Sequence, residues 1–211
     1  MLETSILDQV RSVFQNLEAR YIFHITYNPE HEQAQEFIGF LNNVASCSEK
    51  LSCLLTETDN PGLEFTLLKE GVETDIKFRG IPSGHEFTSL LLAVLNADGK
   101  GKNLPDEAIS RRIKALQGPV RLQTYVSLTC TNCPDVVQAL NIITLLNPQI
   151  THEMVDGALY QEEVDALKIQ GVPSVYANGK LLHVGRGSLG ELLQKLEQTF
   201  GSAPQTDETP I

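Results

Sequence analysis

An internal repeat constrains the fold of this chain more than any other feature. Moving the sequence over itself by 99 residues superposes four pairs of mostly apolar residues: Phe23 on Leu122, Ile25 on Thr124, Leu41 on Leu140 and Val44 on Ile143. The last helices of the two halves match as well, since Ser83-x-x-Glu86 and Ser188-x-x-Glu191 both fit a capping box. We therefore predict two tandem copies of one α/β unit, residues 1–101 and 102–201, packed as one body.

Each copy alternates helical and extended patterns, which predicts a central mixed sheet flanked by helices. In the first copy we expect helices over 2–19, 30–45 and 83–96, and strands over 21–27, 51–56, 63–68 and 74–78. In the second copy we expect strands over 120–128 and 150–155, and helices over 106–116, 161–169, 188–200 and the segment that follows Cys133. Residues 174–184 form a predicted hairpin, because Asn178-Gly179 favours a two-residue turn.

Composition excludes several classes of protein. The net charge of −11 opposes binding to nucleic acid, whose phosphates would be repelled. The longest apolar runs, such as 90–95, are far shorter than the roughly 20 residues that span a bilayer, and the N-terminus lacks the basic start of a secretory signal. Four cysteines in 211 residues do not make a disulfide scaffold, so we expect a cytoplasmic protein. The polar segment 202–211 is a predicted linker to a further portion.

The segment "TCTNCP" contains Cys130 and Cys133, a C-x-x-C pair that fits a redox couple, half of a metal site or two ordinary thiols. Structural zinc takes four ligands, usually as two close pairs, and the chain offers no second close pair. Cys47 and Cys53 are too widely spaced and are better interpreted as small buried residues, and His152 and His183 stand alone in predicted strands.

A redox couple suits this segment better. Cys130 follows a strand and precedes a helix, so that free N–H groups and the positive end of the helix dipole can stabilise a thiolate there. Cys133 lies one turn further on, within reach of the first sulfur, and Pro134 needs no N–H partner in the first turn. We predict Cys130 as the nucleophile and Cys133 as the resolving thiol. The first copy has His31 and Ala34 at the equivalent positions, so only the second copy is equipped for thiol chemistry.

A glycine motif suggests a different kind of site. The segment "GRGSLG" at 185–190 matches the dinucleotide-binding pattern G-x-G-x-x-G, follows a predicted strand and opens a helix. A dinucleotide-binding unit needs a further strand after that helix, and here only the predicted linker follows. We expect these glycines to shape the turn into the last helix.

The strand, C-x-x-C-P and helix, followed by Gly171-Val172-Pro173-Ser174 before a hairpin, resemble the thioredoxin fold. The resemblance implies that Pro173 is the cis-proline beside the disulfide. Thioredoxins also carry a buried acid six residues before the first cysteine, where this chain has Thr124. Glu86 of the first copy is our candidate to supply that acid for proton transfer, although the capping box explains the same residue without a catalytic role.

The tandem of two such units, the first without cysteines at its site, resembles the N-terminal domain of the F subunit of alkyl hydroperoxide reductase over essentially the whole chain. The resemblance implies a dithiol domain that holds no cofactor itself. It would take electrons from a flavoprotein portion that binds FAD and NADH beyond the linker, and would reduce the disulfide of a peroxiredoxin, the C subunit of the same reductase. NADH-dependent activity is not expected of this chain alone. Two alternatives stay open: a stand-alone tandem-thioredoxin disulfide oxidoreductase or isomerase, and a non-catalytic binding module.

Overall fold

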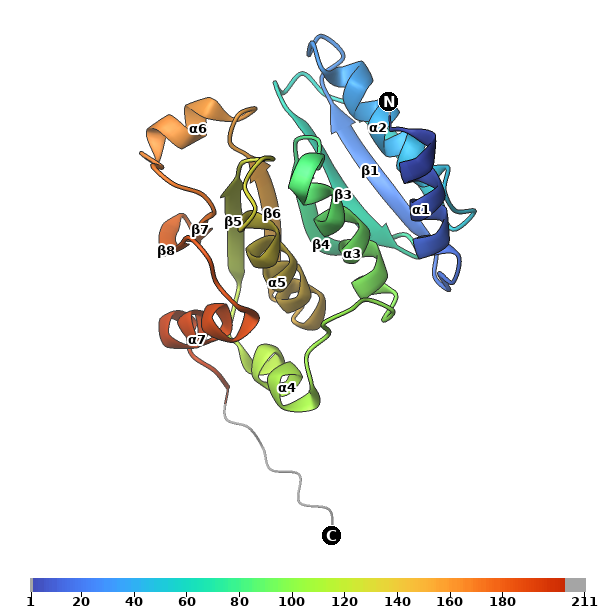
Figure 1. Cartoon of the computed structure of the whole chain (residues 1–211). Helices are drawn as coiled ribbons and strands as arrows, with labels where there is room; N and C mark the ends of the chain where they lie inside the picture. Colours follow the sequence, from blue (N-terminus) through green and yellow to red (C-terminus); the bar gives the residue numbers. More distant parts are fainter. Residues whose placement is uncertain (1, 204–211) are drawn as a thin grey trace.

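One eight-stranded sheet runs through residues 2–203, the part of the chain that the computed structural model describes (Figure 1). Its strand order is β2-β1-β3-β4-β6-β5-β7-β8. The strands are β1 (Tyr21–Tyr27), β2 (Leu51–Glu57), β3 (Leu63–Lys69), β4 (Val72–Arg79), β5 (Val120–Val126), β6 (Ile150–Asp156), β7 (Ser174–Ala177) and β8 (Lys180–Val184). The helices are α1 (Thr4–Phe14), α2 (Ala34–Ala45), α3 (Phe87–Ala97), α4 (Glu107–Ala115), α5 (Cys133–Leu146), α6 (Gln161–Ala166) and α7 (Leu189–Phe200), with a 3₁₀ turn η1 (Gly84–Glu86) before α3.

The two halves of the sheet have the same topology. In the first half β1 pairs in parallel with β2 and antiparallel with β3, which pairs antiparallel with β4. In the second half β5 has the same relations to β6 and β7, and β7 pairs antiparallel with β8. Even the register repeats, because Phe23 lies opposite Cys53 and Leu122 lies opposite His152. The predicted fold of two tandem units, each a mixed sheet flanked by helices, is confirmed.

The halves join by a parallel pairing of β4 with β6, from Ile76 beside His152 to Arg79 beside Val155. They also share a core, because Cys133, Val137 and Met154 of the second half belong to the apolar cluster built on the first. Helix α3 ends at Ala97 and α4 begins at Glu107, so the predicted boundary at residues 101 and 102 falls between them.

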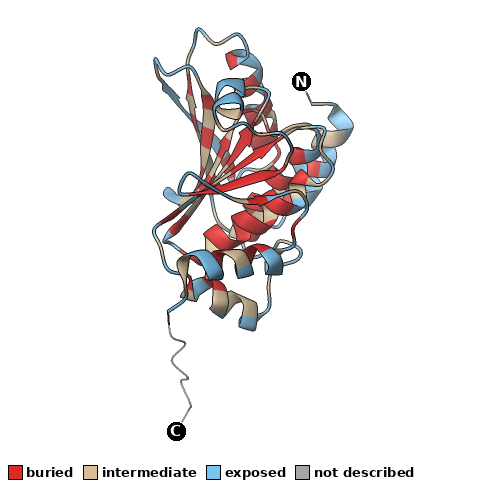
Figure 2. Cartoon of the chain, turned by 90° about the vertical axis from the view of Figure 1, so that its left-hand side faces the viewer, coloured by how far each residue is buried: buried red, intermediate tan, exposed pale blue. Residues whose placement is uncertain are grey.

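Residue alternation explains how the helices are distributed on the sheet. In β6 every second residue from Ile150 to Met154 is buried, and successive side chains of a strand point to opposite faces. Leu122 packs on one face with α5 and α7, whereas Tyr125 and Val155 pack on the other with residues of α6. The buried residues accordingly concentrate in the central strands and in α5, which is buried on most sides (Figure 2). Helix α5, which begins at Cys133, thus packs against the first unit as well as against its own sheet.

The last helix of the first unit begins differently from the expectation. Ser83 makes no side-chain capping bond, so the predicted capping box with Glu86 is wrong there. Instead His85 N–H donates to the carbonyl of Leu128 at 3.0 Å, and Gly84 has a left-handed φ of 56°. A Cβ on Gly84 would lie 2.5 Å from that carbonyl oxygen. Contact with the second unit, rather than capping, shapes this turn. At the start of α7, by contrast, Ser188 and Glu191 form the predicted capping box in full.

The first two residues of the predicted linker are attached to the second unit. Ser202 forms a β-bridge with Leu116, and Ala203 N–H donates to the carbonyl of Ala115 at 2.7 Å. The rest of that segment, 204–211, lies outside the described residues. Among residues 2–203, no helix has both the length and the apolar character needed to cross a membrane.

Candidate redox site

The dithiol lies where β5 gives way to α5. Strand β5 ends at Val126, and after a short loop α5 begins at Cys133. Cys130 and Cys133 are joined as a disulfide, with their Cα atoms 5.6 Å apart. Cys130 is half-buried and Cys133 is fully buried. An external disulfide can therefore approach the sulfur of Cys130 but not that of Cys133.

The start of α5 favours negative charge on Cys130. The backbone N–H of Cys133 points at the Cys130 sulfur, with 3.2 Å between nitrogen and Sγ. Pro134 occupies the first turn, where the missing N–H leaves no helical hydrogen bond unmade. The positive end of the helix dipole adds to this N–H, so both act to stabilise a thiolate on Cys130 once the disulfide is reduced.

The first unit has the same backbone arrangement without the thiols. His31 N–H donates to Asn28 O at 3.1 Å, just as Cys130 N–H donates to Ser127 O at 2.9 Å. Ala34 begins α2 as Cys133 begins α5. The repeat therefore extends to the active-site turn itself, and the first unit carries imidazole and methyl side chains at the places of the two sulfurs.

Pro173 lies beside the disulfide. The Val172–Pro173 peptide bond is cis, and the carbonyl oxygen of Val172 is 3.9 Å from the sulfur of Cys130. This loop leads directly into β7, which pairs with β5. A second cis bond, Gly118–Pro119, stands at the other end of β5, where the sequence offers no signal beyond the Gly-Pro pair.

Glu86 is buried at the boundary between the units. Its side chain is 0% exposed, and neither carboxylate oxygen has a hydrogen-bond partner among the described residues. Its turn, η1, packs against α5, the helix that begins at Cys133. Burial raises the pKa of Glu86 to about 7, and the nearby hydroxyl of Ser89 partly opposes this rise. The structure thus brings a carboxyl group with a near-neutral pKa from the first unit to the redox helix of the second.

The second unit has no acid of its own on the core side of β5. Thr124 is fully buried, and its hydroxyl lies 2.8 Å from Nε2 of His152. The Nδ1 atom of His152 lies 2.7 Å from Oδ1 of Asn141 on α5. Burial lowers the pKa of His152 to about 3, so the imidazole is neutral. His152 thus lies in a buried polar network, and within residues 2–203 it belongs to no group of side chains that could hold a metal ion. The alternation of Ile150, His152 and Met154 is the signal that places it on the core side.

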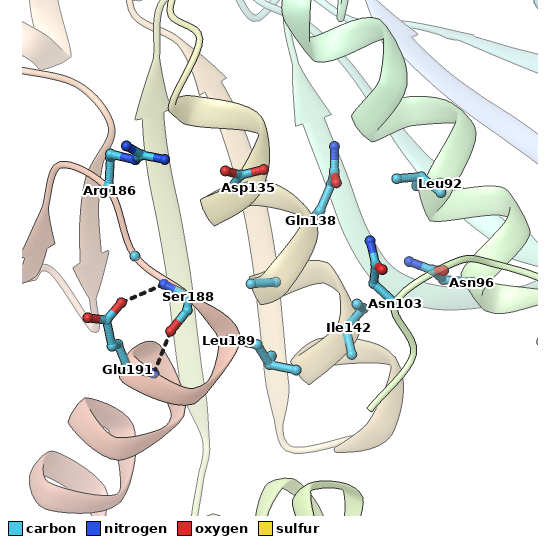
Figure 3. Close-up of a pocket in the computed structure, with 12 residues that line it drawn as sticks. Leu92, Asn96, Asn103, Asp135, Gln138, Ile142, Arg186, Ser188, Leu189 and Glu191 are labelled. Atoms are coloured by element: carbon cyan, nitrogen blue, oxygen red, sulfur yellow. Dashed lines mark hydrogen bonds between the residues drawn. The ribbon is translucent and has the colours of Figure 1, made fainter. Parts of the chain in front are cut away.

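The glycine motif forms a turn beside a groove. Gly185 has a left-handed φ of 86° where the hairpin ends, and the Nε2 of His183 holds the turn through the carbonyl oxygens of Gly185 and Arg186, at 3.0 and 2.8 Å. The turn, α5 and α3 line an open groove of about 420 Å³, which includes Gln138 and the Ser188–Glu191 capping box (Figure 3). Neither disulfide cysteine lines this groove.

The other two cysteines are free thiols. Cys47 is buried, whereas Cys53 is half-buried in β2 at the edge of the sheet. Burial raises the pKa of Cys53 to about 11, which keeps it protonated and unreactive at neutral pH. Within the described ranges, no group of three or more His, Cys, Asp or Glu side chains is arranged to hold a metal ion.

A half-buried cysteine in the loop after a strand, a buried cysteine that begins the next helix and an adjacent cis-proline define a thioredoxin-like thiol–disulfide oxidoreductase domain. The family model for the thioredoxin domain matches residues 120–198, which lie in the second unit. The protein disulfide oxidoreductase of Aeropyrum pernix K1, at 18% identity and a TM-score of 0.81, shares the fold over 97% of this chain and 96% of its own.

The comparisons also identify the family. The crystal structure of the N-terminal domain of alkyl hydroperoxide reductase AhpF from Enterococcus faecalis has 30% sequence identity and a TM-score of 0.85, and covers 93% of this chain and 100% of that one. This chain belongs to the family of N-terminal domains of the F subunit of alkyl hydroperoxide reductase.

Two curated relatives are longer than this chain. The F subunit of alkyl hydroperoxide reductase from Pseudomonas aeruginosa is 36% identical over 93% of this chain, which matches 37% of the relative's length. A Bacillus subtilis protein named NADH dehydrogenase is 37% identical over the whole chain, which matches 41% of its length. The chain therefore spans about two fifths of the relatives it matches.

Proposed function

We propose that this domain carries electrons from a flavoprotein portion to the disulfide of a peroxiredoxin, the C subunit of alkyl hydroperoxide reductase. The observation that carries the proposal is the placement of the half-exposed Cys130 sulfur 3.2 Å from the N–H of Cys133 at the start of α5. Such a sulfur suits nucleophilic attack on an external disulfide, and its partner Cys133 is buried behind it.

The proposed exchange has two steps. The reduced domain presents Cys130 as a thiolate, which attacks one sulfur of the peroxiredoxin disulfide. A mixed disulfide forms, and the other peroxiredoxin sulfur leaves as a thiolate. The Cys133 thiol then loses its proton and attacks the sulfur of Cys130, which releases the second peroxiredoxin thiolate. Two electrons have moved, and the domain is left with the Cys130–Cys133 disulfide.

Glu86 is the proposed acceptor of the proton from Cys133. A general base acts best when its pKa is near the working pH, and burial brings the pKa of Glu86 to about 7. The contact between η1 and α5, and the absence of hydrogen-bond partners for Glu86 within residues 2–203, support the assignment. Pro173 is proposed to shape the surface beside Cys130 on which the partner's chain lies, since Val172 O is close to that sulfur.

The electrons are proposed to come from FAD and NADH bound in a portion that follows residues 202–211. The length of the relatives and the name NADH dehydrogenase of one of them support this part of the proposal. In this division of labour, units 1–101 and 102–201 hold no cofactor, and 202–211 act as the linker. His31 and Ala34 in place of the cysteines leave the first unit without a second dithiol, which disfavours a stand-alone isomerase.

The test offers oxidised peroxiredoxin to the reduced Cys130→Ser and Cys133→Ser variants. Cys133→Ser should accumulate a mixed disulfide through Cys130, because nothing remains to resolve it. Cys130→Ser should trap nothing, because the thiol of Cys133 is buried. Non-reducing electrophoresis and mass spectrometry identify the adduct. Trapping through Cys133, or through neither residue, would contradict the proposed function.

A further inference from the structure

The proton-transfer group Glu86 has a neighbour that no motif singled out. Ser89 lies one helical turn after Glu86, at the i,i+3 spacing that places two side chains side by side. Both residues are 0% exposed, so that neither can be solvated by bulk water. The carboxylate oxygens of Glu86 make no hydrogen bond within residues 2–203, although the Ser89 hydroxyl is near enough to lower the pKa of the carboxyl group. A buried carboxylate in that position needs a donor whenever it is ionised.

Ser89 is held from the other unit. Gln138 on α5 donates its Nε2–H to the Ser89 oxygen at 3.3 Å. A hydroxyl group has only one hydrogen, so a serine that accepts from Gln138 keeps its own hydrogen free for another acceptor. Figure 3 shows Gln138 extending from α5 toward α3, the helix that carries Ser89. The same helix α5 begins at Cys133, five residues before Gln138.

We propose that Gln138 and Ser89 form a hydrogen-bond relay that makes Glu86 a working proton acceptor: Gln138 orients the Ser89 hydroxyl, and Ser89 donates to the Glu86 carboxylate when it is ionised. The relay rests on the proposed role of Glu86, and its two members, Ser89 and Gln138, adjust how readily Glu86 accepts a proton. Ser89 and Gln138 are positioning residues, since neither touches a sulfur in the exchange. The proton itself passes from the Cys133 thiol to a carboxylate oxygen of Glu86, and the sulfur left behind attacks Cys130.

The electrostatic surroundings agree with this assignment. Burial is the main cause that raises the pKa of Glu86, and Ser89 is the group that lowers it. Helices α3 and α5 pack against η1, and the other titratable side chains on these elements and in the loop before α5 are Cys133 and Asp135 on α5, Cys130 in that loop, and His85 on η1. Asp135 and His85 are exposed, and none of the four appears among the causes of the shift. Ser89 is therefore the one side chain that offsets part of the effect of burial on the pKa of Glu86.

The test follows the reaction of the reduced domain with dithiobis(nitrobenzoate), a coloured aromatic disulfide, by stopped flow. The first thionitrobenzoate is released when Cys130 attacks, and the second when Cys133 resolves the mixed disulfide. If Glu86 accepts the proton of Cys133, the rate of the second phase should show a step at the pH where Glu86 ionises. Ser89→Ala removes the donor, so the midpoint of this profile should move upward by about one pH unit. The first phase should be unchanged.

Gln138→Met keeps the shape of the side chain and removes its donor, so it should move the midpoint in the same direction by a smaller amount. Thr88→Ala removes an exposed hydroxyl from the same helix and should leave the profile in place. The first-phase rate and the circular dichroism spectrum show whether each variant is folded. If Ser89→Ala does not fold, the pH profile of Gln138→Met alone tests the relay.

Glu86→Gln separates the relay from the role of Glu86 itself. If Glu86→Gln abolishes the pH step of the second phase while both Ser89→Ala and Gln138→Met follow the wild-type profile, the relay is overturned and the proton-transfer role stands. If Glu86→Gln leaves the second phase unchanged, the role of Glu86 fails and the relay fails with it. An upward shift in both variants, with a flat Thr88→Ala control, supports the relay.

Discussion

The guanidinium of Arg79, on the last strand of the first unit, donates hydrogen bonds to both carboxylate oxygens of Glu163 on α6 of the second unit. It also lies 4.1 Å above the ring of Tyr160, and the hydroxyl of Tyr125 donates to Glu163 at 2.8 Å. Helix α6 has no buried residue of its own. These contacts therefore tie a short, superficial helix of the redox unit to the unit that lacks the dithiol.

Arg79→Met should lower the free energy of unfolding by about 2 kcal/mol, because it removes the cation that pairs with the half-buried Glu163 and leaves only the Tyr125 hydroxyl bound to it. This value lies between the losses typical of exposed and of buried ion pairs, since the side chains of Arg79 and Glu163 are 13% and 37% exposed. Lys77→Met breaks the more exposed pair with Glu64 and should cost less than about 1 kcal/mol. Urea unfolding of both variants measures the difference. Equal losses would show that the ion pair across the units adds no more stability than the pair within the first unit.

Glu86 should make the domain less stable at alkaline pH. Its pKa is raised to about 7 by burial, so its stabilising protonated form is present below the usual carboxyl pKa and is lost as the pH rises through about 7. Between about pH 5 and pH 8 the wild type should lose about 2–3 kcal/mol of unfolding free energy relative to Glu86→Gln, which cannot ionise. If the unfolding free energies of the two proteins change with pH in parallel, the pKa of Glu86 is not raised in the folded domain, and this prediction is wrong.

His152 should act in the opposite direction. Its pKa is lowered to about 3, so the stability contributed by the neutral imidazole is present above the usual histidine pKa and is lost as the pH falls toward about 3. From about pH 7 to pH 5 the wild type should lose about 2 kcal/mol relative to His152→Gln. His85→Gln, at an exposed position, should keep the wild-type slope. Urea unfolding at each pH provides the comparison, and a wild-type slope in His152→Gln would refute the assignment.

The two serine positions at helix starts should differ in their effect on stability. Ser188 accepts from the N–H of Glu191 in the complete capping box, so Ser188→Ala should cost about 1 kcal/mol. Ser83 caps nothing, so Ser83→Ala should cost less than about 0.5 kcal/mol. Thermal and urea unfolding both report the values. A loss of about 1 kcal/mol or more in Ser83→Ala would indicate that Ser83 caps the helix after all.

Cys130 and Cys133 should titrate as one reversible two-electron couple. Thioredoxin, the glutaredoxins and protein disulfide isomerase have potentials of about −180 to −270 mV, and this domain should fall within that window. Equilibration with a glutathione or dithiothreitol series, read by alkylation and mass, measures the potential. Cys130→Ser should show no transition, while Cys53→Ser should match the wild type, since Cys53 is a free thiol apart from the pair. Absence of a transition in that window would count against a reductase.

Much of the site was predictable because its parts are local in sequence. The strand before Cys130, the helix from Cys133 and the turn at Asn178-Gly179 depend on residue alternation, helix starts and turn residues within a few positions. The repeat offset of 99 residues reappears in the structure, since β1 and β5 begin at Tyr21 and Val120, and α2 and α5 at Ala34 and Cys133. These local patterns were therefore sufficient for the two units and the dithiol, whereas Pro173 was a candidate only through the resemblance to thioredoxins.

The surroundings of the dithiol depended on packing between distant segments. Glu86 matched a capping box as well as Glu191 did, and only the approach of η1 to Leu128 and α5 turned one of these two acids into a buried carboxyl group. The network of His152, Thr124 and Asn141 joins three elements that periodicity describes separately. Hydrophobic periodicity specifies which side of an element is buried, but not which polar atom of another element it will face. The sequence by itself determined the two units and the two thiols. The tertiary structure decided which residue supplies the buried acid, because the pairing of β4 with β6 brings the first unit against the second and so buries Glu86 at their boundary.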